Sequence, residues 1–99
     1  MLPSEYVKQG WCKDSFARDN LGRKIASTSD DACQWDIFGA LEASVKSGTI
    51  DRPIRDRLEI VLREGLKPEL LSKWNDQQES VAPVLRMLEI AESILYVTE

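Results

Sequence analysis

Four polar residues in two short motifs are the ones whose types could do chemistry together. Arg18 and Asp19 stand in the triplet Ala-Arg-Asp, whereas Asn75 and Asp76 follow a tryptophan much later in the chain. Two carboxylates beside an arginine could bind a cationic group or polarise a small substrate. Arg18, Asp19 and Asp76 are therefore the candidate residues of a small hydrolase or a ligand-binding enzyme.

The same residues also have a structural interpretation. Arg18 would pair with one of the acids, while Asn75 and Asp76 would bond to backbone amides of a turn or a helix end. Structural ion pairs outnumber functional ones where no further catalytic group is visible. We therefore predict no catalytic residue and retain Arg18, Asp19, Asn75 and Asp76 as a candidate polar cluster.

Three tryptophans, Trp11, Trp35 and Trp74, are a high number for so short a chain. Together they could form an aromatic cage for a cation. Rings of this size also anchor a small core, provided that each indole N–H finds a partner. We predict that they are core anchors.

The absence of histidine from the 99 residues excludes more chemistry than any other feature. It removes Ser-His-Asp and Cys-His catalysis and most catalytic zinc sites. Cys12 and Cys33 are not spaced as a Cys-x-x-Cys pair, so we expect two free thiols, with Cys33 packed within a helix. The stretch "DSFARDNLG" lacks the spacing of a calcium loop. We predict neither a metal nor a cofactor.

Charge and hydropathy narrow the class of partner. Thirteen basic and seventeen acidic residues are interleaved, with a net charge of −4, which gives no electrostatic basis for binding nucleic acid or an anionic membrane. The first residues lack a signal peptide's pattern, and no apolar run reaches the roughly 20 residues that cross a bilayer. We expect a cytoplasmic protein that binds neither nucleic acid nor membrane.

The elements that must position these residues begin with a short helix and an arm. Ser4 is expected to cap the first helix, and Gly10 to end it in a left-handed conformation. Residues 11–28 have no helical period. The turn residues between Asn20 and Gly22 favour an irregular or β-hairpin-like arm.

A second helix is predicted from a cap at Ser29 to a stop at Gly48, with Trp35 on its buried face. Gly39 lies inside this helix, where glycine costs about 1 kcal/mol relative to alanine. Another backbone or a ring is therefore expected to pack closely against it.

A third helix is predicted from a cap at Asp51 to a stop at Gly65. Its polar face is expected to be a solvated surface of paired charges. That face consists of Arg52, Arg55, Asp56, Arg57, Glu59 and Arg63.

Two more helices complete the prediction. A short one begins near Pro68 and is broken by Asn75 and Asp76, and the last begins at Ser80. The apolar residues of the last helix cover about half of its circumference, which is wider than packing on one pair of helices usually needs. We expect its exposed part to dock a protein partner or to form a homodimer seam, through Ile90, Ile94 and Val97.

Several dispersed motifs carry a resemblance to a known family. They are "GW" at Gly10 and Trp11, "ARD" at residues 17–19, Gly22, Trp35, "GAL" at residues 39–41 and "WND" at residues 74–76. In this order they resemble a family of small bacterial proteins catalogued as a domain of unknown function. The resemblance spans most of the chain and implies a bacterial protein with no established activity.

The sequence thus predicts a mainly α single domain over residues 1–99, with four or five helices and an irregular or hairpin-like arm near the N-terminus. The favoured function is a non-catalytic cytoplasmic interaction or regulatory module. The alternative is the small hydrolase or ligand-binding enzyme. Carboxylates facing an open pocket would favour the enzyme, and buried, mutually paired ones the module.

Overall fold

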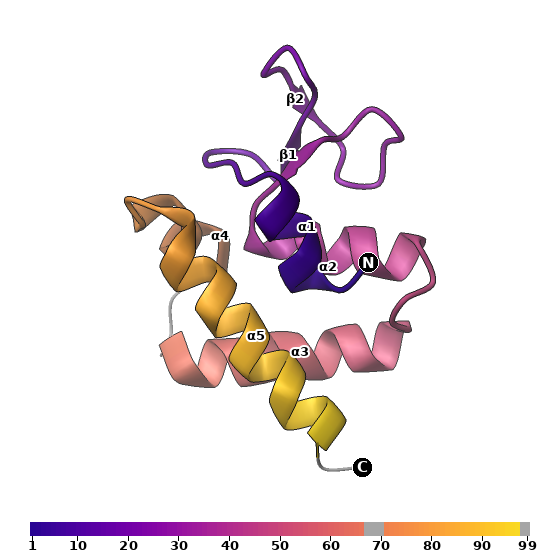
Figure 1. Cartoon of the computed structure of the whole chain (residues 1–99), viewed down its shortest axis with the longest axis vertical. Coiled ribbons are helices and arrows are strands. Elements are labelled where there is room, and N and C mark those ends of the chain that lie inside the picture. The colour runs from indigo at the N-terminus through magenta and orange to yellow at the C-terminus, as the bar shows by residue number, and fades with distance from the viewer. Residues whose placement is uncertain (67–70, 98–99) are drawn as a thin grey trace.

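The computed structural model of the chain describes the backbone of residues 1–66 and 71–97 and the side chains of residues 1–64 and 71–95. Five helices and a small sheet make up this part of the chain (Figure 1). The elements are α1 (Pro3–Gln9), β1 (Ala17–Arg18), β2 (Lys24–Ile25), β3 (Gln34–Trp35), α2 (Ile37–Lys46), α3 (Arg52–Leu66), α4 (Leu71–Gln77) and α5 (Val81–Val97). The predicted fold class, mainly α with a hairpin-like arm, is confirmed.

The arm is built on an antiparallel sheet with the strand order β2-β1-β3. Ala17 of β1 lies opposite Ile25 on one side and Trp35 on the other. On its free side Trp35 forms a parallel bridge with Trp11, and its N–H donates to the carbonyl of Gly10 at 3.0 Å. The strand β3 is therefore joined by backbone hydrogen bonds to β1 on one side and to residues 10–12, which follow α1, on the other.

The second helix begins later than the sequence predicts. Its cap is Asp36, whose Oδ1 accepts a hydrogen bond from the N–H of Gly39 at 2.6 Å. The prediction of a helix from Ser29 was wrong over its first turns, because Trp35 pairs with Ala17 in the sheet. The Ser29 hydroxyl accepts only a local N–H, two residues further on.

The first helix is capped from a distance. The predicted cap at Ser4 was wrong, because the helix starts at Pro3 and the Ser4 hydroxyl donates elsewhere. Both the N–H and the hydroxyl of Ser4 donate to the carboxylate of Glu92 in α5, at 2.8 and 2.5 Å. Glu5 accepts the N–H of Leu2 at 2.8 Å. Gly10 is extended, so its predicted left-handed conformation was also wrong.

The later helices follow their local signals more closely. The Asp51 carboxylate accepts a backbone N–H three residues on, at 2.9 Å, which confirms the predicted cap of α3. Asn75 and Asp76 lie inside α4, so the prediction that they break it was wrong. The Asn75 side chain bonds to other elements instead of competing for the backbone of its own helix. Pro68, the predicted start, lies outside the described residues.

The core lies where the helices meet. In Figure 1, α2 and α3 run one above the other, and α5 crosses in front of α3. The helix α1 packs against α2 and α5, and α3 packs against α5. Buried side chains from every helix and from the arm join this core, among them Val7, Ala17, Trp35, Ile37, Leu41, Leu58, Leu62, Leu71, Val84, Leu88 and Leu95.

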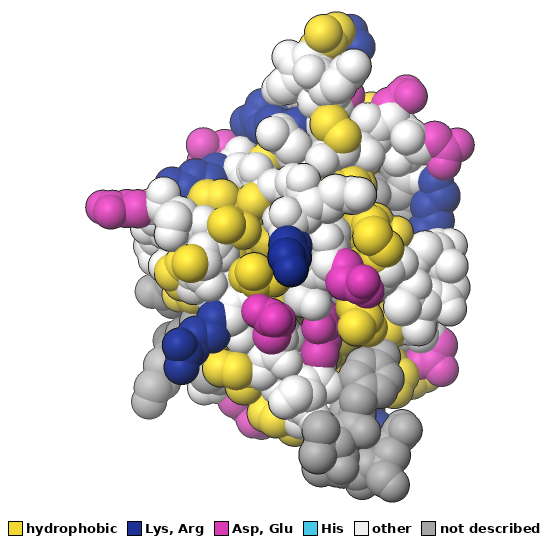
Figure 2. Space-filling view, viewed as in Figure 1, with side chains coloured by type: hydrophobic (Ala, Val, Ile, Leu, Met, Phe, Trp, Pro, Cys, Tyr) yellow, Lys and Arg dark blue, Asp and Glu magenta, His cyan; other side chains and the backbone are white. Residues whose placement is uncertain are grey.

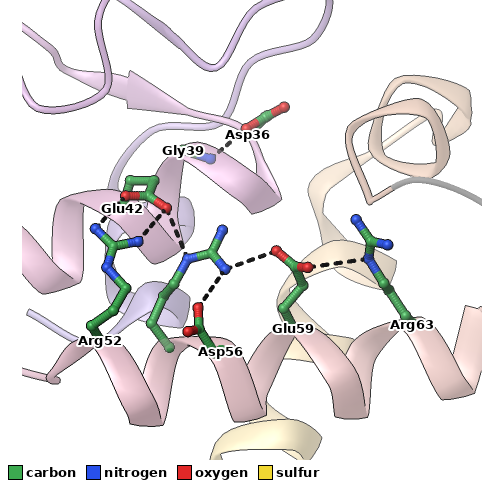
Figure 3. Close-up of polar contacts among 8 residues, drawn as sticks. Asp36, Gly39, Glu42, Arg52, Asp56, Glu59 and Arg63 are labelled. Atoms are coloured by element: carbon green, nitrogen blue, oxygen red, sulfur yellow. Dashed lines mark hydrogen bonds and ion pairs between the residues drawn. The ribbon is translucent and has the colours of Figure 1, made fainter.

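The charged face of α3 is not wholly solvated, because Arg55 is buried and the prediction for that residue was wrong. Its guanidinium donates to Glu42 of α2 at 2.8 Å and pairs with Asp56 and Glu59 at 3.0 and 2.8 Å. It also lies 4.9 Å from the ring centre of Phe38. Figure 3 shows this network along α3, with Arg52 and Arg63 at its two ends. It joins α2 to α3.

Candidate functional site

Asn75 is a fully buried member of the predicted polar cluster. Its Oδ1 accepts the indole N–H of Trp11 at 2.8 Å and the backbone N–H of Ile37 at 3.1 Å. Its Nδ2 donates to the carbonyl of Cys12 at 3.0 Å and to Asp76 Oδ1 at 3.2 Å. Both donors and both acceptor positions of the amide are used. Asn75 therefore joins the arm, the start of α2 and α4.

Arg18 and Asp19 are held by other partners, within the arm. Arg18 donates to the carbonyls of Gly22 and Lys13, at 2.7 and 3.1 Å, and not to a carboxylate. Asp19 accepts both the backbone N–H and the Nε of Arg23, at 2.9 and 2.8 Å. These bonds from Arg23 lower the pKa of Asp19. Among the described residues, both side chains form hydrogen bonds only within the arm, where they shape the hairpin.

A cleft of about 520 Å³ opens between the arm and the helices α2 and α4. It is lined by Asp14, Ser15, Phe16, Asp36, Ser72 and Asp76. Asp76 brings the predicted cluster to this cleft, where its Oδ1 accepts the N–H of Asp14 at 2.9 Å. Asp14 has a φ of 62°, which is uncommon for a residue other than glycine. The bond to Asp76 therefore fixes an unusual turn at the edge of the cleft.

Asp36 is the acid of this cleft that sequence reasoning missed. It is 1% exposed, and its Oδ2 accepts the hydroxyl of Ser72 at 2.8 Å. Burial raises the pKa of Asp36 to about 6, against the bonds from Gly39 and Ser72, and the charge of Asp76 raises it further. An aspartate just ahead of an apolar run is a helix-start signal, and this signal could have found Asp36.

Gly39 determines how closely the arm approaches α2. A Cβ at this position would lie 1.9 Å from the carbonyl oxygen of Phe16, so alanine has no room there. The prediction of close packing at Gly39 is confirmed. The same Phe16 carbonyl accepts the N–H of Asp36 at 3.1 Å, and the Phe16 ring lies 5.0 Å from that of Phe38. Backbone contacts therefore hold the arm against the start of α2, beside the cleft.

The three tryptophans lie around this junction in different environments. Trp35 is buried, meets Tyr6 edge-on at 4.8 Å, and donates its indole N–H to the carbonyl of Ser27 at 3.4 Å. Trp11 is half-buried and is held by the amide described above. Trp74 is half-buried against the core. These contacts support the interpretation of the rings as anchors.

The two cysteines do not form a disulfide bond with each other. Cys12 and Cys33 are both free, as predicted. Cys12 is the buried one, and its burial, together with the nearby charge of Asp36, raises its pKa to about 12. Cys33 is exposed ahead of β3, so its predicted packing within a helix was wrong. The Cys12 thiol is therefore protonated at neutral pH and is a poor nucleophile.

The chemistry of the cleft is that of an acceptor-rich surface. Its carboxylates and hydroxyls suit an amine or a hydroxyl group better than an anion. Among the described residues, no three acidic or sulfur-bearing side chains converge as a metal site would require. In the same part of the chain no helix combines the length and apolar character needed to cross a membrane.

A second candidate surface lies on the helices α3 and α5. We call it the α3–α5 face and define it by Ile60, Ile90 and Ile94, which are 57%, 46% and 46% exposed. A groove of about 250 Å³ on this face is lined by Arg57, Ile60, Val61, Glu64, Ile94 and Leu95. The side chain of Val97 lies outside the described residues. Figure 2 shows that hydrophobic side chains on the side drawn lie in separate patches between charged ones.

Fold and surfaces together define a small, mainly helical protein with a sheet-based arm locked to its core. Comparison with models of protein families shows to which family the chain belongs. The model of a family of unknown function (DUF6197) matches residues 5–93, and the chain belongs to this family. Searches of the curated proteins and of the solved structures gave no match.

Proposed function

We propose that this chain is a non-catalytic protein-interaction module that binds its partner through the α3–α5 face. One observation carries the proposal. Of the six large hydrophobic side chains exposed in the described part of the chain, the three isoleucines of this face lie on two helices that pack together. Two of them, Ile60 and Ile94, line the same groove, and exposed apolar surface shared between packed elements is typical of association sites.

The enzyme alternative has less support. Arg18 and Asp19 are engaged in the hairpin, and Asp76 alone of the proposed catalytic residues lines the cleft. The protonated thiol of Cys12 offers no nucleophile near neutral pH. The buried, bonded state of Asp19 and Asn75 favours a structural role for the polar cluster.

The proposal also includes a bacterial, cytoplasmic setting without nucleic acid or membrane as partner. The free thiols support it, because an exposed cysteine such as Cys33 persists most readily in a reducing compartment. The net charge of −4 argues against a polyanionic partner.

Affinity capture from extracts of cells that produce the chain tests the proposed function. The bait is either the native protein, the double variant Ile60→Lys/Ile90→Lys, or the control Leu21→Lys. Leu21 is 70% exposed in the arm, so the control also replaces an exposed apolar side chain by lysine. We expect a protein retained by the native bait and by the control to be lost from the double variant.

Circular dichroism and thermal unfolding establish that all three baits are folded. Exposed positions tolerate such changes with little loss of stability. Retention that is equal for the three folded baits, or no specific retention by any of them, would contradict the proposed function.

A further inference from the structure

One stripe of α3 has a charge pattern that complements itself. Arg57, Ile60, Val61 and Glu64 follow the spacing that places residues on one side of a helix. All four line the groove of the α3–α5 face. The stripe therefore presents a base at one end, two aliphatic side chains in the middle and an acid at the other end.

Among the described charged side chains of α3, only the two on this stripe form no ion pair. The other charged side chains of α3 form ion pairs with each other or with Glu42: Arg52, Arg55, Asp56, Glu59 and Arg63. Within the part of the chain that the structure describes, neither Arg57 nor Glu64 forms an ion pair. Both side chains are exposed.

We infer that the partner of this face is a second copy of the chain, and that the two α3 helices pack antiparallel about a two-fold axis between Ile60 and Val61. This inference rests on the proposed function. About that axis, Arg57 of each copy faces Glu64 of the other, and Ile60 faces Val61. A two-fold interface requires a self-complementary surface, and this stripe has that property.

Charge selects this register over its neighbours. An axis centred on Ile60 itself would place Arg57 against Arg63, and Asp56 against Glu64, of the second copy. A parallel arrangement would place each charge against its own kind. Like charges facing each other across an interface disfavour it. Of these three arrangements, the axis between Ile60 and Val61 alone pairs both exposed charges of the stripe favourably.

The helix α5 widens the contact. Ile94 and Leu95 form the wall of the groove beside the stripe. A second α3 helix lying along the stripe therefore also covers apolar surface of α5. The sequence predicts a homodimer seam on the last helix. In the inferred dimer this seam includes residues of both α5 and α3.

Charge reversal with sedimentation velocity tests the inference. We expect the native chain to sediment at twice its 11.2 kDa mass at micromolar concentration. Arg57→Glu and Glu64→Arg should each raise the dissociation constant of the dimer by about ten-fold or more, because each creates two like-charge contacts. Lys24→Glu, a reversal on the exposed edge of the arm, is the control and should leave the dimer unchanged.

Mixing the two reversed variants provides the sharper test. In a mixed dimer of Arg57→Glu with Glu64→Arg, both contacts are again between opposite charges, so the equimolar mixture should recover the native affinity. A native chain that stays monomeric into the submillimolar range would overturn the inference. So would a mixture that stays as weak as its components.

The outcome separates the two proposals. If the native chain is monomeric while the capture experiment still retains a protein that the double isoleucine variant loses, the second copy is the wrong partner and the interaction module stands. If neither experiment detects association through this face, both proposals fail.

Discussion

Asn75 is the single residue on which three parts of the fold depend. Its amide holds Trp11 and Cys12 of the arm and Ile37 at the start of α2. A buried amide with all its partners contributes modestly by itself, whereas its removal leaves several buried groups without partners. The weight of this residue therefore lies in what its loss would leave unsatisfied.

We predict that Asn75→Ala lowers the free energy of unfolding by about 3 kcal/mol or more. The substitution leaves the N–H groups of Trp11 and Ile37 and the carbonyl of Cys12 without their partner. Urea unfolding followed by tryptophan fluorescence measures the loss. Gln77→Ala, at an exposed site on the same helix, is the control, and its loss should stay within about 0.5 kcal/mol. Equal losses for the two variants would refute the role of Asn75.

The raised pKa of Asp36 predicts an unusual dependence of the free energy of unfolding on pH. Its pKa rises from 3.8 to about 6 on folding, so in this interval the folded protein binds more protons than the unfolded chain. The contribution of Asp36 to the free energy of unfolding therefore decreases as the pH rises from about 4 to about 6. Asp36→Asn removes the ionisation but keeps an oxygen for the N–H of Gly39, so this decrease should disappear, with stability at neutral pH equal or higher.

Urea unfolding at a series of pH values measures this difference between Asp36→Asn and the native chain. The matched control is Asp51→Asn, because Asp51 also caps a helix but is exposed. The control should keep the native pH profile between pH values of about 4 and about 6. If Asp36→Asn keeps that profile as well, the carboxyl does not titrate as its environment implies.

At the scale of elements, local signals predicted what local interactions decide. Asp51 caps α3 through its side-chain carboxylate, and Gly48 ends the turn after α2 with a φ of 79°, so both ends could be read from the sequence. The start of α1 could not, and the local signal of Asp36 did not exclude an earlier start of α2 at Ser29. A carboxylate from α5 caps the first, and strand pairing by Trp35 delays the second.

The candidate site was predictable to the same extent. Residue type alone identified Asn75 and Asp76 as candidates. In the structure Asn75 bonds to the arm and Asp76 lines the cleft. Nothing in the sequence shows that Arg18 would turn back into its own hairpin or that Asp36 would be buried. Both outcomes depend on how the arm packs on α2, and periodicity does not encode that contact.

Arg55 yields a prediction for the contact between α2 and α3. Its guanidinium separates Glu42 from Glu59, so Arg55→Met leaves two partly buried carboxylates without their shared partner. We expect the free energy of unfolding to fall by about 3 kcal/mol. Arg63→Met removes an exposed arginine that pairs with the same Glu59 and should cost at most about 0.5 kcal/mol.

Urea unfolding of both arginine variants at moderate ionic strength makes the comparison. Added salt should weaken the small effect of Arg63→Met further and leave that of Arg55→Met largely intact, because buried pairs are screened less. A loss for Arg55→Met no larger than that of its control would show that the network does not stabilise the packing of α2 on α3.

At the scale of the whole molecule, one contact joins segments from opposite ends of the described chain. Glu92 of α5 accepts two hydrogen bonds from Ser4 at the start of α1. Burial raises the pKa of Glu92, and the two hydrogen bonds from Ser4 act in the opposite direction. These bonds offset part of the free-energy cost of removing the carboxylate from water. The position of α1 therefore depends on α5 as well as on α2.

We predict that Glu92→Ala lowers the free energy of unfolding by about 2 kcal/mol and exposes the amides of α1 to faster hydrogen exchange. The amide and hydroxyl of Ser4 then lose their acceptor. Glu89→Ala, on an exposed part of α5, is the control and should change neither quantity. Unchanged exchange of the α1 amides in Glu92→Ala would contradict the dependence of α1 on α5.

The link between Ser4 and Glu92 also has a consequence for the order of events during protein synthesis. The ribosome releases α1 first, but the group that caps its start is incorporated 88 residues later. Until then, Val7 and its neighbours have no completed surface to cover them, and a contact this distant in sequence forms late. We therefore expect the nascent chain to present α1 to chaperones and proteases until α5 has emerged from the ribosome.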